Sequence, residues 1–256
     1  MMALASRLIC AGFSFRENSL RLAAIVFIMQ CIYSSPAQEC PQEHVILLHG
    51  GMRSTNSMSR IERALAGAGY TVHNIDYSTR NSTILDISED VIGNAIATCE
   101  QENARKIDFI THSTGGILVR SYLKRHSIPS LGCVVMLGPP NQGSEVANIL
   151  GRLWIVTNFY HTAMSELTTD TNSTARTLGP ANFCLGVIAG DRSFNWLYSL
   201  FIPGKDDGMV AVNSTKLTGM TDHIVIHTTH TFMVYNHAVI KETMYFLKNG
   251  KFEHFH

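Results

Sequence analysis

The chain has 256 residues, of which 45% are hydrophobic and 16% are charged, so it can build one sizeable domain around a large core. Twenty basic and twenty acidic residues cancel, and no long run of like charge occurs, which argues against nucleic acid as a partner. The mean hydropathy of +0.07 is high for a soluble protein, partly because of an apolar N-terminal stretch.

Residues 1–37 have the order of a secretory signal peptide. Arginines supply positive charge, an uninterrupted apolar run spans residues 22–29, and residues 35–37 place small side chains where a signal peptidase cuts. The run is short for a membrane span. We therefore expect export to the periplasm or the medium, with residues 38–256 as the mature domain. An uncleaved membrane anchor through residues 20–37 is the alternative, because the charged region is long.

Export would place the cysteines that follow the signal peptide in an oxidising compartment. Cys40 precedes the first predicted strand and Cys99 ends a predicted helix, so a bridge between them at the domain edge is our hypothesis. Cys133 and Cys184 open apolar strands and are expected to be free thiols in the core. The cysteine spacings do not resemble a zinc site.

Short apolar segments rich in β-branched residues recur along the chain and predict strands. They span residues 44–48, 70–77, 107–110, 131–137, 183–189 and 223–227. Apolar residues at helical spacing predict helices near residues 58–68, 84–100, 117–123 and 240–247. This alternation indicates an α/β fold, with a mostly parallel sheet of about six strands and helices on both faces. Right-handed crossovers then bring the carboxyl ends of the strands to one edge, where active sites of such sheets lie.

Residues 106–122, KIDFITHSTGGILVRSY, predict a strand, a sharp turn and a helix, with Ser113 in the turn. The segment Thr111-His112-Ser113-Thr114-Gly115 resembles the G-x-S-x-G nucleophile elbow of the α/β-hydrolases, in the form used by bacterial lipases and esterases. Thr111 departs from the pattern, because Gly is usual at that position. The resemblance covers most of residues 43–249, and it implies the α/β-hydrolase fold with Ser113 as the nucleophile.

A serine nucleophile needs a base within hydrogen-bond reach, and that base needs an orienting acid. In α/β-hydrolases the three follow in the order Ser, Asp or Glu, His. Residues 206–210, DDGMV, resemble the D-G-x-V segment that carries the catalytic Asp of bacterial lipases. The resemblance implies this role for Asp207. Its neighbour Asp206, and Asp191 directly after the fifth predicted strand, are the competing candidates.

The candidate base is His230, which lies just beyond the last predicted strand and before the closing helix. It resembles the catalytic histidine of the same lipase-like group. His223 and His227 bound that strand and are expected to be structural. His237 begins the closing helix, where solvent exposure is the simpler interpretation.

Residues 49–52, HGGM, follow the first strand and resemble the H-G-x loop of lipases. The resemblance implies that the backbone N–H of Gly51 and that of Thr114 form an oxyanion hole. The candidate substrate-binding residues are Met52, His112 and Trp154.

Residues 143–182 form an irregular segment with a polar, Thr-rich middle and apolar residues upstream, Trp154 among them. We expect part of this segment to line the pocket, as a lid or as a wall of the acyl pocket. An ordinary covering helix with a surface loop is the alternative.

Taken together, the resemblance implies a lipase or esterase of the triacylglycerol lipase type that cleaves carboxylic esters through an acyl-enzyme on Ser113. Its substrate would be a small-molecule or lipid ester, with transient contact to a lipid surface. No cofactor and no metal site are expected. The alternatives are another acyl-transfer enzyme, such as a transacylase, thioesterase or amidase, and a non-catalytic binding protein with the same fold.

Overall fold

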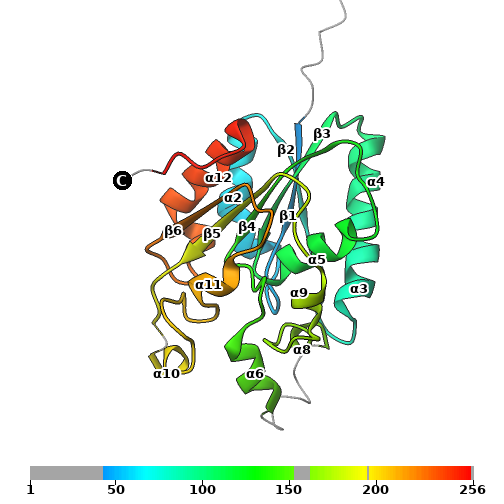
Figure 1. The fold of residues 1–256 in the computed structure, drawn as a ribbon. Helices are drawn as coiled ribbons and strands as arrows, with labels where there is room; N and C mark the ends of the chain where they lie inside the picture. Colours follow the sequence, from blue (N-terminus) through cyan, green and yellow to red (C-terminus); the bar gives the residue numbers. More distant parts are fainter. Residues whose placement is uncertain (1–42, 153–161, 195, 255–256) are drawn as a thin grey trace, which may run out of the picture. The chain divides into compact units, whose positions relative to one another are not determined.

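A sheet of six parallel strands forms the centre of the molecule, in the order β2-β1-β3-β4-β5-β6 (Figure 1). The computed structural model describes residues 43–152, 162–194 and 196–254. The strands are β1 (Glu43–Leu48), β2 (Thr71–Ile75), β3 (Lys106–His112), β4 (Leu131–Leu137), β5 (Leu185–Gly190) and β6 (Asp222–Ile226). The α/β fold and the parallel sheet of six strands predicted from the sequence are therefore confirmed.

Helices cover both faces of this sheet (Figure 1). On one face lie α2 (Ser59–Gly67) and α12 (His237–Asn249). On the other face lie α5 (Thr114–Leu123) and a continuous helical segment made of α3 (Ile84–Ile87), the π-helical turn η2 (Ser88–Ile92) and α4 (Gly93–Gln101). Shorter helices lie in the connecting segments: η1 (Thr55–Met58), α6 (Glu145–Arg152), α8 (Thr162–Ser165), α9 (Thr174–Thr177), α10 (Trp196–Ser199), α11 (Val212–Thr215) and η3 (Met233–Tyr235). In the parts of the chain with described structure, no helix is both long and apolar enough to cross a membrane.

The central strands are apolar on both faces because each face packs against helices. In β1, Val45 and Leu47 join the core beneath α2 and α12, whereas Ile46 and Leu48 join the core beneath α4 and α5. All four side chains are fully buried. Helices therefore pack on both faces of the sheet and keep the strands in place. The loops that follow the carboxyl ends of the strands begin from these fixed positions.

The cysteine pairing differs from the prediction. Cys133 and Cys184 form a disulfide, and Cys99 is a free, buried thiol. The expectation of free thiols at Cys133 and Cys184 is therefore wrong, and so is the Cys40–Cys99 bridge; Cys40 itself lies outside the described residues. The physical reason is the register of the sheet, because β4 pairs with β5 so that Val134 faces Leu185 and the two preceding cysteines come side by side.

We expect loss of this disulfide to lower the free energy of unfolding by about 2–4 kcal/mol, because it closes a long loop in the unfolded chain. Urea unfolding of the Cys133→Ala/Cys184→Ala variant, compared with the unmodified chain, measures the effect. Dithiothreitol should destabilise the unmodified chain and leave the double variant unchanged. Equal stability of the unmodified chain with and without reductant would contradict the assignment.

Arg120 of α5 holds the segment 143–182 against the sheet. Its guanidinium is buried and donates to the carbonyls of Asn141 (3.3 Å), Ala175 (3.0 Å) and Gly179 (2.9 Å). Burial lowers the pKa of Arg120 to about 10, so the group still carries its charge at neutral pH. Arg120 therefore ties the residue just before the segment, and the C-terminal part of the segment, to the helix that follows Ser113.

Candidate active site

Ser113 stands in a sharp turn between β3 and α5. Its backbone has φ 53° and ψ −119°, a conformation that non-glycine residues rarely adopt and that is typical of a nucleophile elbow. A hydrogen bond from the N–H of Ser113 to the carbonyl of Leu137, at 2.8 Å, fixes the turn to the end of β4. Gly115 is required because a Cβ there would lie 2.8 Å from the carbonyl oxygen of Leu48.

The structure shows how Thr111 fits where Gly is usual. Its side chain is fully buried, and its hydroxyl lies 3.2 Å from the position that a Cβ on Gly116 would occupy. Because Gly116 has no side chain, there is space for the side chain of Thr111. The departure from the motif is accommodated without loss of the elbow.

Ser113, His230 and Asp207 are joined by hydrogen bonds. Oγ of Ser113 lies 3.0 Å from Nε2 of His230, and Nδ1 of His230 lies 2.8 Å from Oδ2 of Asp207. The other oxygen of Asp207 accepts from the N–H groups of Met209 (3.0 Å) and Val210 (2.8 Å). The loops after β5 and β6 thus bring a fixed carboxylate and an imidazole to the serine, in an arrangement suited to proton transfer from its hydroxyl.

The competing acids lie elsewhere. Asp206 accepts from the hydroxyl of Ser199 (2.9 Å) and from the N–H of Gly208 (2.7 Å), so its carboxylate stabilises the loop. Asp191 lies 2.9 Å from Nδ1 of His227 and 3.2 Å from Nζ of Lys205, which makes a surface ion-pair cluster.

The other candidate histidines are also separate from Ser113. His223 contacts the hydroxyl of Thr215 at 3.0 Å, and His237 is exposed at the start of α12. The structure therefore joins only His230, of the histidines considered from the sequence, to the serine.

The loop after β1 packs closely onto the elbow. A Cβ on Gly50 would lie 2.6 Å from Nδ1 of His112, and a Cβ on Gly51 would lie 3.1 Å from the hydroxyl of Thr114. Only glycines allow this approach, which places the backbone of Gly51 beside the start of α5. The N–H of Thr114 belongs to the first turn of that helix, where N–H groups lack carbonyl partners within the helix. Both predicted oxyanion-hole residues therefore lie next to Ser113.

His49 supports this loop rather than the reaction. Its Nδ1 donates to the carbonyl of Gly50 at 2.8 Å, and its ring stacks on that of Tyr77 with centroids 4.2 Å apart. The hydroxyl of Tyr77 in turn donates to the carbonyl of His49.

An open pocket of about 510 Å³ surrounds Ser113 and His230. Met52, which is 67% exposed, is one of its lining residues. His112 also borders the pocket, but it is buried, and its Nε2 donates to the carbonyl of His230 at 3.0 Å. It therefore fixes the position of His230. Trp154 lies outside the described residues.

The lining residues that sequence reasoning missed include Met164, Met209 and Tyr235. A smaller enclosed space of about 20 Å³ continues from Ser113, and Met164 and Met209 line both spaces. The remaining apolar residues of the enclosed space are Pro140, Ala147, Leu167 and Val210. Part of the segment 143–182 thus lines the pocket, although no local pattern singled out Met164.

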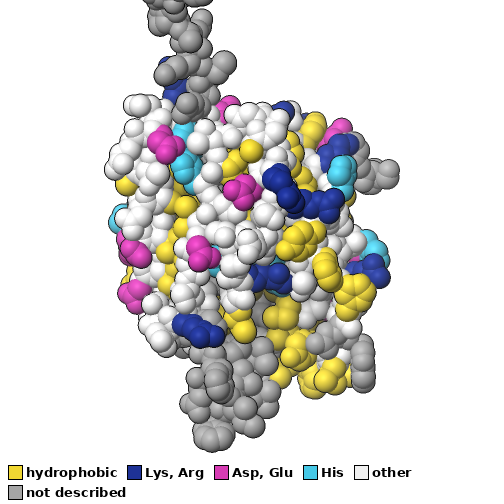
Figure 2. All heavy atoms as spheres, turned by 180° about the vertical axis from the view of Figure 1, so that it is seen from behind, with side chains coloured by type: hydrophobic (Ala, Val, Ile, Leu, Met, Phe, Trp, Pro, Cys, Tyr) yellow, Lys and Arg dark blue, Asp and Glu magenta, His cyan; other side chains and the backbone are white. Residues whose placement is uncertain are grey.

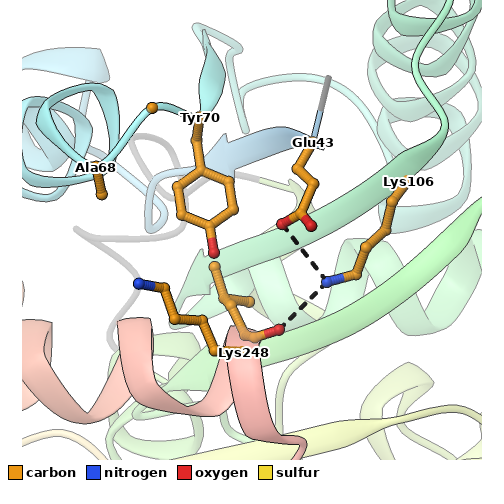
Figure 3. Close-up of a pocket in the computed structure, with 7 residues that line it drawn as sticks. Glu43, Ala68, Tyr70, Lys106 and Lys248 are labelled. Atoms are coloured by element: carbon orange, nitrogen blue, oxygen red, sulfur yellow. Dashed lines mark hydrogen bonds and ion pairs between the residues drawn. The ribbon is translucent and has the colours of Figure 1, made fainter. Parts of the chain in front are cut away.

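A second hollow, of about 370 Å³, lies at the amino-terminal ends of β1 and β3 (Figure 3). Nζ of Lys106 lies 4.0 Å from a carboxylate oxygen of Glu43 and donates to the carbonyl of Leu247 at 3.2 Å (Figure 3). The residues that line this hollow include no serine or cysteine beside a histidine. The pocket around Ser113 is the candidate active site.

A family model described as palmitoyl protein thioesterase matches residues 44–184, which is more than half of the chain. The chain belongs to the palmitoyl protein thioesterase family. It is accordingly a hydrolase of the esterase, lipase and thioesterase type with the α/β-hydrolase fold. No curated protein sequence matches the chain.

Solved structures similar to this family member include lipases and esterases. Mature lipase BlEst2 of Bacillus licheniformis has a TM-score of 0.65 and 20% identity, over 84% of this chain and 94% of that one. Phospholipase PlaB of Legionella pneumophila has a TM-score of 0.56 and 19% identity, over 68% of this chain and 46% of that one. A lipase-esterase related protein of Clostridium acetobutylicum has a TM-score of 0.54 and 14% identity, over 82% of this chain and 95% of that one. At these identities the likeness establishes the fold.

We expect the thioesterase family member to lose stability as the pH falls from 7.5 to 5. Burial lowers the pKa of His49 and holds that of His112 well below its ordinary value of 6.5. Below about pH 6.5 the unfolded chain therefore binds more protons than the folded chain, and the free energy of unfolding falls by about 1.4 kcal/mol for each unit of pKa difference. Urea midpoints across this range measure it, and His112→Gln should reduce the slope. A midpoint independent of pH would contradict the prediction.

Proposed function

We propose that this protein is a serine hydrolase that cleaves thioesters and carboxylic esters of an apolar acyl group through an acyl-enzyme on Ser113. The observation that carries the proposal is the chain of hydrogen bonds from Ser113 through His230 to Asp207, at 3.0 and 2.8 Å, on a strained elbow. Membership of the palmitoyl protein thioesterase family favours a thioester as the physiological bond. The carboxylic ester expected from the sequence remains part of the proposal.

In the proposed mechanism, Oγ of Ser113 attacks the acyl carbonyl while Nε2 of His230 takes its proton. The N–H groups of Gly51 and Thr114 stabilise the oxyanion, and such a donor typically contributes about 3 kcal/mol. His230 then gives its proton to the leaving thiol or alcohol. Water, deprotonated by His230, attacks the acyl-enzyme and releases the acid, and Ser113 regains its proton. Asp207 keeps Nδ1 of His230 protonated throughout.

The apolar character of the acyl group is argued from the enclosed space beside Ser113. Its walls are mostly apolar, and its volume of about 20 Å³ is too small for a fatty acyl chain as it stands. Met164 and Met209 border both this space and the open pocket, and methionine side chains rearrange readily. A chain could therefore enter by moving these two side chains, with the open pocket left for the leaving group.

An apolar surface near the pocket supports contact with lipid. It consists of exposed large side chains on and around α10 and after β6: Phe194, Leu197, Leu200, Phe201 and Phe232. Hydrophobic side chains gather at the lower right of Figure 2, where the half-turn from Figure 1 brings α10. Tyr235 lines both the active-site pocket and the hollow that contains Phe194 and Phe232. We propose that lipid-bound substrates approach over this surface.

Export is also proposed, through residues 1–37. The Cys133–Cys184 disulfide supports it, because structural disulfides persist mainly in oxidising compartments. The mass of the protein recovered from the membrane and soluble fractions shows whether residues 20–37 are cleaved or remain as an anchor.

The test of the function uses matched pairs of substrates, in which an oxygen ester and a thioester carry the same acyl group, over a series of chain lengths. We expect both bonds to be cleaved, with kcat/KM rising with chain length and the thioester preferred at each length. Met164→Ala should shift the preference toward longer chains. Folded protein that cleaves neither member of any pair would overturn the proposal.

A further inference from the structure

A cluster of metal-binding side chains lies at the amino-terminal end of the sheet, at the opposite end of the strands from Ser113. His44 comes from β1, His73 from β2 and Cys99 from α4. One ligand atom of each lies within 4.8 Å of the other two. His44 and Cys99 are fully buried, and His73 is largely buried. Neither the hydrolase mechanism nor the oxyanion hole uses any of these groups.

A carboxylate lies beside the two histidines. Glu102, at the end of α4, places Oε2 3.5 Å from Nε2 of His73 and 3.8 Å from Nδ1 of His44. The two imidazole nitrogens lie 2.9 Å apart. The two imidazoles, from β1 and β2, thus have both a thiol and a carboxylate close to their nitrogens.

We propose that His44, His73, Cys99 and Glu102 bind a divalent cation of the zinc type. Ligand atoms around tetrahedral zinc lie about 3.3–3.6 Å apart, given zinc–nitrogen and zinc–sulfur distances of about 2.0–2.3 Å. The nitrogen–oxygen distances here are close to that spacing, and the nitrogen–nitrogen distance needs to open by a few tenths of an ångström. Two imidazoles, a thiolate and a carboxylate also match the donor preferences of zinc.

The alternative is a packed pair of histidines that share one hydrogen bond. That interpretation accounts for the nitrogen–nitrogen contact and for the stacked rings, whose centroids lie 5.1 Å apart. It does not account for a thiol and a carboxylate beside the same two rings. A cation would use all four donors, and the Cys99 thiol would release its proton to solvent on binding.

The site would be structural. Four protein donors leave no open position for substrate, which distinguishes structural from catalytic zinc. The cation would connect the edge strand β2 to β1 and to the end of α4. It would enter from solvent past Glu102, whose side chain is 47% exposed. Removal of the cation should therefore change stability and leave the chemistry at Ser113 intact.

The experiment titrates Co²⁺ into the chelator-stripped, folded protein and then displaces it with Zn²⁺. We expect one equivalent to bind, with the intense visible bands of tetrahedral cobalt and a thiolate-to-cobalt band in the near ultraviolet. Cys99→Ser should lose the near-ultraviolet band. Glu102→Gln, which changes a half-exposed side chain, should fold normally and bind Zn²⁺ at least tenfold more weakly. His126→Ala, at an exposed histidine, is the control and should bind like the unmodified chain.

Stability provides an independent readout. Zn²⁺ should raise the thermal midpoint of the unmodified chain and of His126→Ala, and it should not raise that of Cys99→Ser. Absence of cobalt absorption in folded protein, or a near-ultraviolet band that persists in Cys99→Ser, would overturn the proposal.

Discussion

Replacing Ser113 by Ala is expected to lower kcat by about five to six orders of magnitude, because the acyl-enzyme can no longer form. The remaining machinery, His230 and the oxyanion hole, would give only residual catalysis over the uncatalysed reaction. Initial rates with the best thioester substrate, normalised to active protein, measure the loss. The thermal midpoint should stay close to that of the unmodified chain, because the substitution removes one oxygen atom.

The matched control is Ser127→Ala, at an exposed serine. It should keep the full rate, which shows that the loss at Ser113 does not come from handling or expression. A Ser113→Ala variant with more than a few per cent of the normal rate would contradict the acyl-enzyme mechanism.

Asp207→Asn is expected to lower kcat by about four orders of magnitude. The carboxylate accepts a hydrogen bond from Nδ1 of His230 and from two backbone N–H groups. An amide at this position can turn its NH₂ toward the imidazole, which favours the tautomer that no longer accepts the proton of Ser113. Rates across the pH range should stay low, because the defect lies in the tautomer and not in a shifted titration.

Asp206→Asn is the control for this change, because Asp206 is adjacent in sequence and also buried. Its carboxylate bonds to Ser199 and Gly208 and does not contact His230. We expect the rate of Asp206→Asn to stay within a few-fold of normal. If Asp206→Asn lost more activity than Asp207→Asn, the assignment of the acid would be wrong.

The fold was predictable because its signals are local. Apolar runs such as residues 44–48 and 131–137 give strands, and the Gly-rich turn after β3 gives the elbow. The order of Ser113, Asp207 and His230 along the chain follows from the topology, since the carboxyl ends of parallel strands share one edge. Motif and order together therefore selected the three residues that the structure brings into hydrogen-bond contact.

The features that were missed depend on register and on contacts between distant segments. Cys133 and Cys184 pair because of how β4 and β5 align, which the sequence of neither strand specifies. Met164 reaches the pocket from a segment with no regular pattern. His44 and His73 meet diagonally across two strands, so they have none of the short spacings by which zinc ligands are recognised.

The most direct test of an activated serine in this protein is labelling with a fluorophosphonate, followed by mass mapping of the modified peptide. The account predicts a single adduct on Ser113, formed rapidly by the unmodified chain and lost in His230→Ala. Labelling is repeated with detergent, so that a pocket that closes in water is also tested. Folded protein that remains unlabelled under both conditions, or that is labelled at another serine, would contradict the account.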